Sequence, residues 1–359
     1  MLLFSSYRVY AWLTLTFITL GIVGNLISIC VFTSSKLRGS NGSRYSLAIS
    51  IADIAVLLTY VLVEWFEHGL PVLLGPCKHW NPINFHDYSC RIFKLVSCAA
   101  QFIAAYIVVA FNVERCVAVK CPFESRMYIN AKLSRWVIVC VVVAGFFVSL
   151  WKPFLSGLYY GLDNSTDLPK ICMRNMDYDV LYFTFEAVFA TLIMLLPVVI
   201  LFFANMYLFS ALVWKEKPGQ KLPTVTERER KIRWEFGAMF AIISVWFCVT
   251  NIWYYIMYFR VYHSTNKEDL YDLHEHIAYK RVLQAVYYSN YCVNFLIFFF
   301  VGESYRNVIW SWLQRCRKPG NAALGPRNST AYSSICGNPN TTHQIELSAV
   351  STTSKNGHM

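Results

Sequence analysis

The chain has 359 residues, of which 56% are hydrophobic and 15% are charged, and its formal net charge is +11. Soluble domains are about 45–50% apolar and about 25% charged, so this balance excludes an ordinary soluble protein and indicates a membrane protein. A positive net charge can also accompany nucleic-acid binding, but we find no stacking or base-reading motif and expect no nucleic-acid partner.

Apolar runs that are long enough to cross a bilayer follow one another along the chain. A helix needs about 20 apolar residues to cross the hydrocarbon core. Seven such runs are predicted, over residues 11–32, 45–66, 92–119, 136–150, 180–214, 236–259 and 282–301. The sequence therefore predicts an all-α membrane protein, a bundle of seven transmembrane helices. The first run is too long for a cleavable signal peptide, so we expect it to act as its own insertion signal.

Basic residues are denser in the connections after the first, third, fifth and seventh runs than in the opposite connections. Because cytoplasmic loops carry an excess of Lys and Arg, the N-terminus is expected outside and the C-terminus in the cytoplasm, in a plasma membrane. Acidic residues gather in the opposite loops, which would make the outer mouth attractive to a cation. Loops that are simply polar would produce the same pattern.

The first and second runs contain Asn25 and Asp53, and the seventh contains Asn290 and Asn294. The two seventh-run asparagines are four residues apart, so they are predicted to share a helix face. Polar groups in hydrocarbon should contact one another or water. Both a switching network and a hydrogen-bonded cluster without a switching role fit this pattern.

The third run ends in NVERCVAVKCPF, which sets Glu114 beside Arg115. Cys90 precedes this pair by about 25 residues, or about 37 Å of helix, so the cysteine and the pair should lie at opposite faces of the membrane. Charges at the end of a membrane helix are costly to bury and therefore suggest a function. Two side chains that reach into the headgroup region would explain them equally well.

The segment ERCVAVKCPF resembles the E/D-R-Y region of rhodopsin-like G-protein-coupled receptors, and other motifs fall in register with it. GIVGN contains Asn25, SLAISIAD contains Asp53, the fifth run contains Pro197, and NYCVNFLIF contains the two asparagines. The resemblance covers residues 21–318. It implies that Glu114 holds Arg115 in the resting state and that release of the arginine opens a cavity for a G protein.

The resemblance also implies a mid-membrane water and sodium pocket centred on Asp53, and a disulfide between Cys90 and Cys172. Ala104 stands where the family usually has a serine, which removes a sodium ligand, and Cys116 replaces the tyrosine after the arginine. We expect no other cofactor.

Three further departures concern the sixth and seventh runs. FCVTN puts Val249 and Asn251 where the family has tryptophan and proline, and NFLIF puts Phe295 and Phe298 where it has proline and tyrosine. Without proline, the seventh run is predicted to lose its kink. Lys231 stands where some members have an acidic partner for the arginine, so no second lock is expected.

Outside the seven runs, Cys77 is left as an odd outer cysteine, either free or an alternative disulfide partner, and Asn164 in NST is a glycosylation acceptor. The segment after the seventh run is predicted to form a short amphipathic eighth helix, over residues 302–318 (GESYRNVIWSWLQRCRK). Cys316 in this segment is placed for palmitoylation. Residues 1–318 are then the receptor domain. Residues 319–359 are rich in Gly, Asn, Ser and Thr and are predicted to be a disordered cytoplasmic tail.

No phosphate loop, metal spacing or nucleophile elbow points to an enzyme, and no inverted repeat points to a transporter. Ser97 stands where amine receptors carry an aspartate, which disfavours an amine ligand. The seventh run has no lysine near Tyr288 for a retinal Schiff base.

The short third inner loop and the segments ERCVAVKCPF, LLPVVILFFANMY and NYCVNFLIF are most similar to invertebrate FMRFamide-type neuropeptide receptors. A peptide that ends in Arg-Phe-amide needs a carboxylate for its guanidinium and an aromatic wall for its ring. The candidate ligand contacts are Glu64, Gln101, Glu186, Trp253, Tyr254, Gln284 and Tyr287.

The prediction is a G-protein-coupled receptor that binds an extracellular amidated Arg-Phe neuropeptide and activates a heterotrimeric G protein. Arrestin and membrane lipid are further predicted partners. Two alternatives stay open: a constitutive or scaffold seven-helix protein without an agonist, and a chemoreceptor for small molecules.

Overall fold

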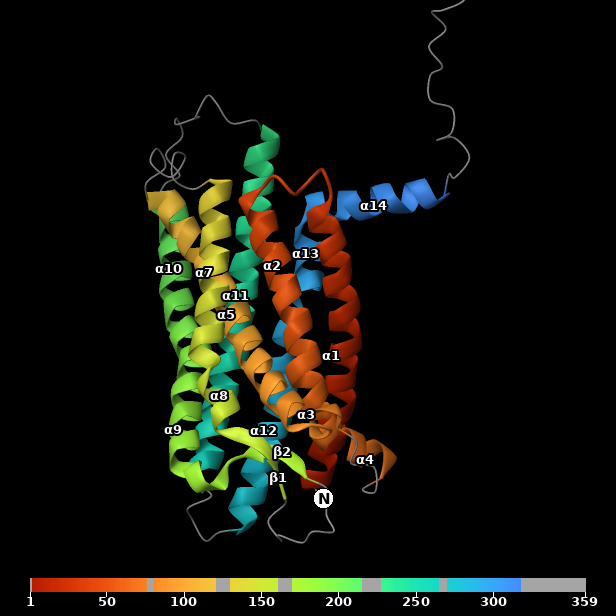
Figure 1. The fold of residues 1–359 in the computed structure, drawn as a ribbon. Helices are drawn as coiled ribbons and strands as arrows, with labels where there is room; N and C mark the ends of the chain where they lie inside the picture. Colours follow the sequence, from red (N-terminus) through yellow and green to blue (C-terminus); the bar gives the residue numbers. More distant parts are fainter. Residues whose placement is uncertain are drawn as a thin grey trace, which may run out of the picture. The chain divides into compact units, whose positions relative to one another are not determined.

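The computed structural model of the protein describes residues 2–75, 81–120, 130–160, 170–214, 227–264 and 270–317. Helices dominate these residues, and a two-stranded sheet joins them (Figure 1). In chain order the elements are α1 (Leu2–Thr33), α2 (Asn41–Val56), α3 (Leu62–His68), α4 (Leu70–Leu74), α5 (Asp87–Lys120), α7 (Ala131–Ser149), α8 (Trp151–Phe154), β1 (Ser156–Tyr159), β2 (Ile171–Arg174), α9 (Asp179–Ala190), α10 (Leu196–Trp214), α11 (Glu227–Ser264), α12 (Leu270–Tyr288), α13 (Asn294–Val301) and α14 (Glu303–Arg317).

The membrane spans predicted from the apolar runs are present. Among the described residues, uninterrupted spans cover Ser5–Thr33, Asn41–Leu74, Asp87–Lys120, Ala131–Phe154, Met176–Ala211 and Lys231–Arg260. Glu275–Tyr291 and Asn294–Val301 together make a seventh span that is bent by 50°. The predicted all-α bundle of seven transmembrane helices is therefore confirmed, with spans that extend a few residues beyond the apolar runs.

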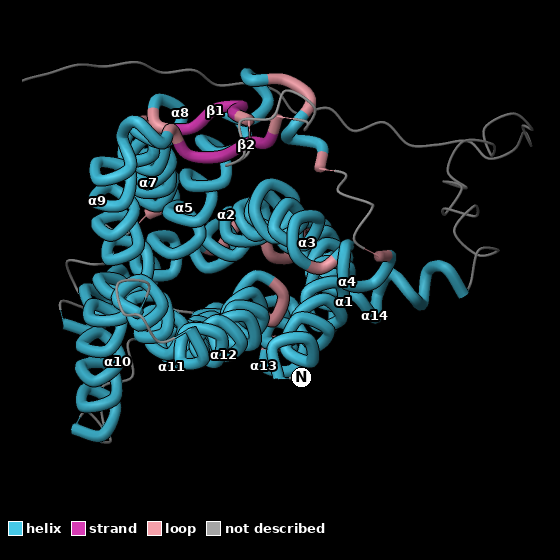
Figure 2. Tube along the Cα trace, turned by 90° about the horizontal axis from the view of Figure 1, so that it is seen from below, coloured by secondary structure: helices cyan, strands magenta, loops and turns pink. Residues whose placement is uncertain are grey.

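The chain divides into two compact units, Met1–Trp312 and Leu313–Met359, and the bundle lies in the first. Within it, α1 packs against α2 and α12, while α5 contacts α2, α7, α10 and α11 (Figure 2). In the 18-residue apolar stretch of each span, 61% of the residues of α5 are buried, compared with 17% for the span of α7 and α8. The helix that carries Glu114 and Arg115 is thus the central one of the bundle.

The surface of the bundle is apolar where a soluble protein would be polar. Large side chains such as Phe147, Phe154, Phe203 and Phe209 are between 64% and 75% exposed. Such a surface is stable only against hydrocarbon. Inside the bundle, aromatic rings fill the space between helices, as where Phe32 meets Phe298 at 5.0 Å and Phe111 meets Phe240 at 3.9 Å between ring centroids.

Two spans contain a π-helical turn, at Leu57–Val61 and at Thr191–Leu195. Pro197 follows the second turn and lacks the N–H that would bond four residues back, which gives a local cause for the irregularity there. No proline accompanies the first turn. It lies between α2 and α3, so it changes the direction in which the side chains of α3 point.

The seventh span is bent although it lacks proline, so the predicted loss of the kink is wrong. A 3₁₀ turn over Ser289–Tyr291 separates α12 from α13. The Asn25 Nδ2 donates to the freed carbonyl of Tyr291 at 2.9 Å. Gly24 also allows a close approach, because a Cβ there would lie 2.1 Å from the Phe295 ring. The bend is thus supported by α1 rather than by a proline in the seventh span.

Candidate functional site

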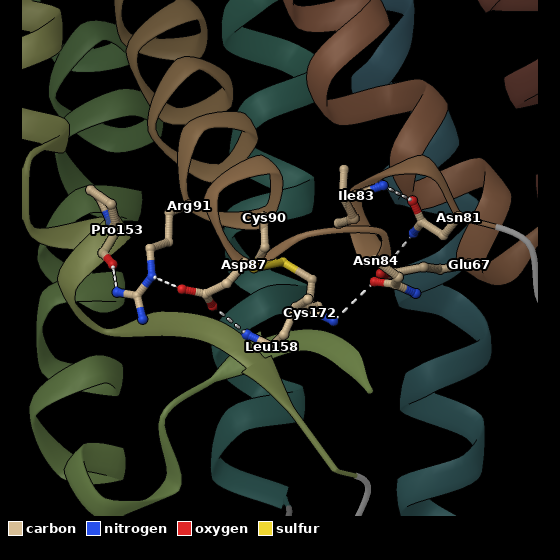
Figure 3. Close-up of a disulfide and its surroundings, with 10 residues drawn as sticks. All are labelled: Glu67, Asn81, Ile83, Asn84, Asp87, Cys90, Arg91, Pro153, Leu158 and Cys172. Carbon is tan, nitrogen blue, oxygen red and sulfur yellow. Dashed lines mark hydrogen bonds and ion pairs between the residues drawn. A yellow bond between two sulfur atoms is a disulfide. The ribbon is translucent and has the colours of Figure 1, made fainter. Parts of the chain in front are cut away.

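One end of the bundle, here called the disulfide end, contains the predicted disulfide. Cys90 at the start of α5 is bonded to Cys172 on β2, with Cα atoms 5.5 Å apart, which confirms the predicted pairing. β1 and β2 pair antiparallel, with Leu158 opposite Cys172. The hairpin is therefore covalently attached to α5 (Figure 3).

Hydrogen bonds hold the hairpin on both sides of the disulfide (Figure 3). Asp87 accepts from the Leu158 N–H at 2.9 Å and from Arg91 at 2.6 Å. Asn84 accepts from the Cys172 N–H at 2.9 Å. The hairpin is thus fixed at this end of the bundle by side chains of α5 and of the segment before it.

Beneath the disulfide end lies a cavity of about 290 Å³ between the spans. Ligand pockets for small molecules are typically about 300–1,000 Å³, so this volume suits one or two residues of a peptide. The polar and aromatic lining residues include Thr59, Tyr60, Glu64, His68, Phe93, Lys94, Ser97, Gln101, Lys152, Tyr182, Glu186, Phe189, Tyr254, Tyr258, Lys280, Arg281 and Gln284.

Glu64 lines the cavity from α3, directly after the first π-helical turn. Its Oε2 lies 3.7 Å from Arg281 Nη1 and 3.6 Å from His68 Nε2, and it accepts a hydrogen bond from Gln284 at 3.3 Å. Arg281 also donates to Gln284 at 2.8 Å. Glu64 is therefore already the counter-ion of a cationic side chain from α12.

Glu186 lines the opposite part of the cavity from α9, where it forms an ion pair with Lys152 of α8. Lys152 is only 5% exposed, and its Nζ lies 4.6 Å from the ring centroids of both Trp151 and Tyr182. A buried ammonium group needs a paired carboxylate, and Glu186 supplies it. Both predicted acidic ligand contacts thus face the cavity with a positive partner in place.

Five of the predicted ligand contacts line the cavity: Glu64, Gln101, Glu186, Tyr254 and Gln284. Trp253 is 58% exposed on the outside of the bundle, so it does not contribute to this cavity. Tyr287 lies behind the lining, stacked on Tyr254 with ring centroids 4.9 Å apart.

The predicted ligand contacts did not include the cationic lining residues Lys94, Lys152, Lys280 and Arg281. For Lys94, a signal was present in the sequence. It shares a helix face with Ser97 and Gln101, three and seven residues further on, and both of these line the cavity as well.

In the middle of the bundle, the four predicted polar residues take part in three separate sets of hydrogen bonds. Asn294 donates to Asp53 Oδ2 at 2.7 Å. Asn290 instead exchanges hydrogen bonds with Thr250 of α11, at 2.7 and 3.0 Å, while Asn25 supports the bend. Asn290 and Asn294 both line a small cavity of about 20 Å³, although the helix between them is interrupted.

The sodium ion that the resemblance implies can be tested against the lining of this small cavity. Asp53, Asn290 and Asn294 supply one carboxylate and two amides, and Ala104 supplies no side-chain oxygen. Hard cations are held by several oxygen ligands, and one carboxylate oxygen already accepts from Asn294. The residues present do not fit a sodium ion.

The opposite end of the bundle, here called the arginine end, contains Glu114 and Arg115. Glu114 accepts hydrogen bonds from Tyr45 at 2.8 Å, from Asn41 at 3.2 Å and from Ser134 at 3.2 Å. Within the described residues Arg115 makes no ion pair; its guanidinium lies 4.5 Å from the centre of the Phe111 ring, and its Nε is buried without a hydrogen bond. The acidic residue therefore binds α2 and α7 rather than its neighbour in the sequence.

α11 reaches α14 at the arginine end through two contacts. Lys231 Nζ lies 2.7 Å from Glu303 Oε2, and this hydrogen bond holds the pKa of Glu303 below its usual value. Glu235 is 4% exposed and accepts from the backbone N–H of Ser304 at 3.0 Å. Some family members have an acidic partner for the arginine at the position of Lys231. In this chain, Lys231 instead pairs with Glu303 of α14.

The interior face of α11 does not include the residue that stands at the family's tryptophan position. Val249 is 49% exposed, so it does not occupy the buried place of the family's tryptophan. Phe247, Thr250 and Asn251 are buried instead. α11 is also a continuous helix of 38 residues, consistent with Asn251 in place of proline.

Four predicted features depend on parts of the chain that lie outside the described residues. Cys77 and Asn164 lie outside the described residues, as do residues 318–359. Cys316 lies in the last turn of α14, but its side chain is outside the described part of the chain.

Comparison with known proteins adds the family context. The family model described as 7 transmembrane receptor (rhodopsin family) matches residues 24–298. An allatostatin-A receptor of Bombyx mori is 22% identical over 331 residues, covering 90% of this chain and 84% of that protein. The B1 bradykinin receptor of Tupaia minor is 23% identical over 321 residues, covering 87% and 85%. The FMRFamide peptide receptor frpr-18 of Caenorhabditis elegans is 26% identical over 154 residues, covering 42% and 34%.

Proposed function

Because this chain belongs to the rhodopsin family of seven-transmembrane receptors, we propose that it binds an extracellular peptide at the cavity of the disulfide end and activates a heterotrimeric G protein at the arginine end. In this proposal the disulfide end faces the outside and the C-terminus is cytoplasmic, in agreement with the distribution of Lys and Arg in the loops.

One observation carries the proposal. α5 lines the cavity with Lys94, Ser97 and Gln101 and, on the same 34-residue helix, carries Arg115 at the other end. A ligand in the cavity therefore contacts the helix whose far end would meet the G protein. The relatives named for allatostatin-A, bradykinin and FMRFamide support a peptide as the ligand.

An amidated Arg-Phe peptide is the finer proposal. Glu64 and Glu186 line the cavity and are the acceptors that a ligand guanidinium would need, and Tyr182, Tyr254 and Tyr258 offer aromatic walls. Since both carboxylates have cationic partners, such a guanidinium has to replace Arg281 or Lys152 in its ion pair. Arginine is suited to such an exchange because its planar group binds a carboxylate with two hydrogen bonds.

The proposal is tested by G-protein activation in cells that express the chain, with a panel of amidated Arg-Phe peptides and a general peptide library. We expect a peptide response that falls at least about tenfold, equivalent to about 1.4 kcal/mol, in Arg115→Ala. Arg135→Ala, an exposed arginine at the same end, is the matched control and should leave the response unchanged. Surface labelling shows that the variants reach the membrane.

Two results would contradict the proposal. High activity without peptide, unchanged by every peptide, would favour a constitutive protein. A response to small organic molecules but not to peptides would favour a chemoreceptor. If peptides activate the chain but Glu64→Gln and Glu186→Gln leave the potency of Arg-Phe peptides unchanged, only the Arg-Phe assignment fails.

A further inference from the structure

The cavity at the disulfide end has more positive than negative side chains. Among the described residues that line it, the cationic ones are Lys94, Lys152, Lys280 and Arg281, and the anionic ones are Glu64 and Glu186. His68 also lines the cavity, and its protonation would increase the excess. Glu67 is not part of the lining, and it accepts a hydrogen bond from Asn81 at 3.2 Å. Even with Glu67 included, the positive charges remain in excess.

The two carboxylates do not neutralise this excess, because each is engaged with another cation. Glu186 is paired with Lys152, and Glu64 lies 3.7 Å from Arg281. Lys94 and Lys280 are then left over. Within the described residues neither lysine has a hydrogen bond or an ion pair, and the Nζ of Lys280 lies 5.1 Å from the centre of the Tyr258 ring.

Without a ligand, the positive charge of each of these two lysines is destabilised by its surroundings. Both are partly buried, and they come from α5 and α12, on helix faces that also carry the cavity residues Gln101 and Gln284. An ammonium group that has lost part of its water without gaining a carboxylate is destabilised. A ligand anion would offset that loss, and the excess positive potential would attract it into the cavity.

We infer that this cavity takes a carboxylate of the ligand, with Lys94 and Lys280 as its counter-ions and with an adjacent aromatic residue against Phe93, Tyr182, Tyr254 and Tyr258. The inference rests on the proposed function in one respect, that the cavity is the ligand site. The carboxylate belongs to a free C-terminus or to an Asp or Glu side chain. An amidated Arg-Phe peptide has no C-terminal carboxylate, so it can supply the carboxylate for this site only from an acidic side chain.

The first experiment tests the cavity directly on the purified full chain in detergent. The probes are N-acetyl-phenylalanine and its amide, which share the ring and differ in the carboxylate. At equal millimolar concentrations, we expect the carboxylate to raise the midpoint of thermal unfolding more than the amide does, because only the carboxylate pairs with the lysines.

Two variants control this comparison. The difference between the two probes should disappear in the Lys94→Gln and Lys280→Gln double variant. It should persist in Lys170→Gln, since Lys170 lies outside the cavity with its Nζ 4.9 Å from the Tyr160 ring, much as Lys280 faces Tyr258. Equal effects of the two probes on the unmodified chain, including no effect, would overturn the inference. A difference that persists in the double variant would overturn it too.

The second experiment identifies the source of the carboxylate from peptides that activate the receptor. Each acidic residue is changed to its amide, and the C-terminus is made both free and amidated. We expect one of these changes to lower the potency about tenfold or more, with no further loss when it is combined with the lysine variants. Peptides that are indifferent to every carboxylate would overturn the inference while the proposed function stands. If the carboxylate probe stabilises the chain specifically but no peptide activates it, the carboxylate site stands and the proposed peptide-receptor function fails.

Discussion

Individual charged residues in this protein are positioned by partners that are distant in the sequence. Lys152 is almost fully buried and is paired with Glu186, and aromatic rings of Trp151 and Tyr182 surround its ammonium group. Glu114, which adjoins Arg115 in the chain, is instead held by Tyr45, Asn41 and Ser134. Lys152 and Glu114 therefore have their partners on other helices, whereas Arg115 is left against a phenyl ring.

The Lys152–Glu186 pair leads to a prediction at the residue scale. Lys152→Met should lower the thermal unfolding midpoint of the purified protein, because it leaves the Glu186 carboxylate without its partner. Breaking a fully buried pair costs about 3–5 kcal/mol, and the 27% exposure of the Glu186 side chain should reduce that value. Adding Glu186→Gln should recover part of the loss, whereas Lys170→Met should have little effect. An unchanged midpoint in Lys152→Met would mean that the pair does not stabilise the fold.

At the scale of elements, α11 and α14 are joined by two side-chain contacts at the arginine end. α11 contacts the beginning of α14 through Glu235, which binds the N–H of Ser304, and through Lys231, which pairs with Glu303. The acidic side chain of Glu235 is well placed there, because the first N–H groups of a helix have no partner within the helix. The seventh span is in turn bent by contacts with α1.

We predict that the contact between α11 and α14 holds the receptor in its resting state. Glu235→Leu removes a hydrogen bond to a charged acceptor, worth about 1.5–3 kcal/mol, and should raise G-protein activation without peptide. Glu235→Gln keeps an acceptor oxygen and should change the basal activity less. Lys231→Glu should give a smaller rise, because both partners are half exposed, and the exchange Lys231→Glu with Glu303→Lys should reverse it. Lys132→Glu, an exposed lysine on α7, is the control. Basal activity that is equal in all these variants would exclude this role.

On the scale of the whole molecule, a central helix connects the two ends of the bundle. About 21 residues separate Lys94 from Arg115 on α5, or about 32 Å along the helix. The hydrogen bond between Asp53 and Asn294 lies in the layer between them, beside α5 residues Ala104 and Ala105. At the disulfide end, α5 is also covalently attached to the β-hairpin through Cys90 and Cys172.

Loss of this disulfide should therefore affect the whole cavity end. We expect Cys90→Ser with Cys172→Ser to lower stability by about 2–4 kcal/mol, measured as the unfolding midpoint, and to weaken the response to an activating peptide. Reduction of the unmodified protein should give the same result. Cys140→Ser is the control, since Cys140 is an exposed free cysteine on α7. Full peptide response in the double variant would mean that the hairpin can hold its place by the hydrogen bonds of Asp87 and Asn84 alone.

The number and order of the membrane helices were determined by the sequence itself, because hydropathy is a local property that each apolar run carries independently of its neighbours. The same is true of the amphipathic α14, whose pattern is contained in 15 consecutive residues. The Cys90–Cys172 pairing was also predicted correctly, from a resemblance and not from spacing.

Only the tertiary structure decided which charges meet. Glu64 and Arg281 are more than two hundred positions apart, and Lys152 is buried against Glu186 although it comes just after the apolar run at residues 136–150. The bend of the seventh span likewise depends on Asn25 and Gly24 of another helix, so the absence of proline led to the wrong prediction. Val249 faces outward because the rotation of α11 is set by its packing against neighbouring helices, which no local pattern in that segment specifies.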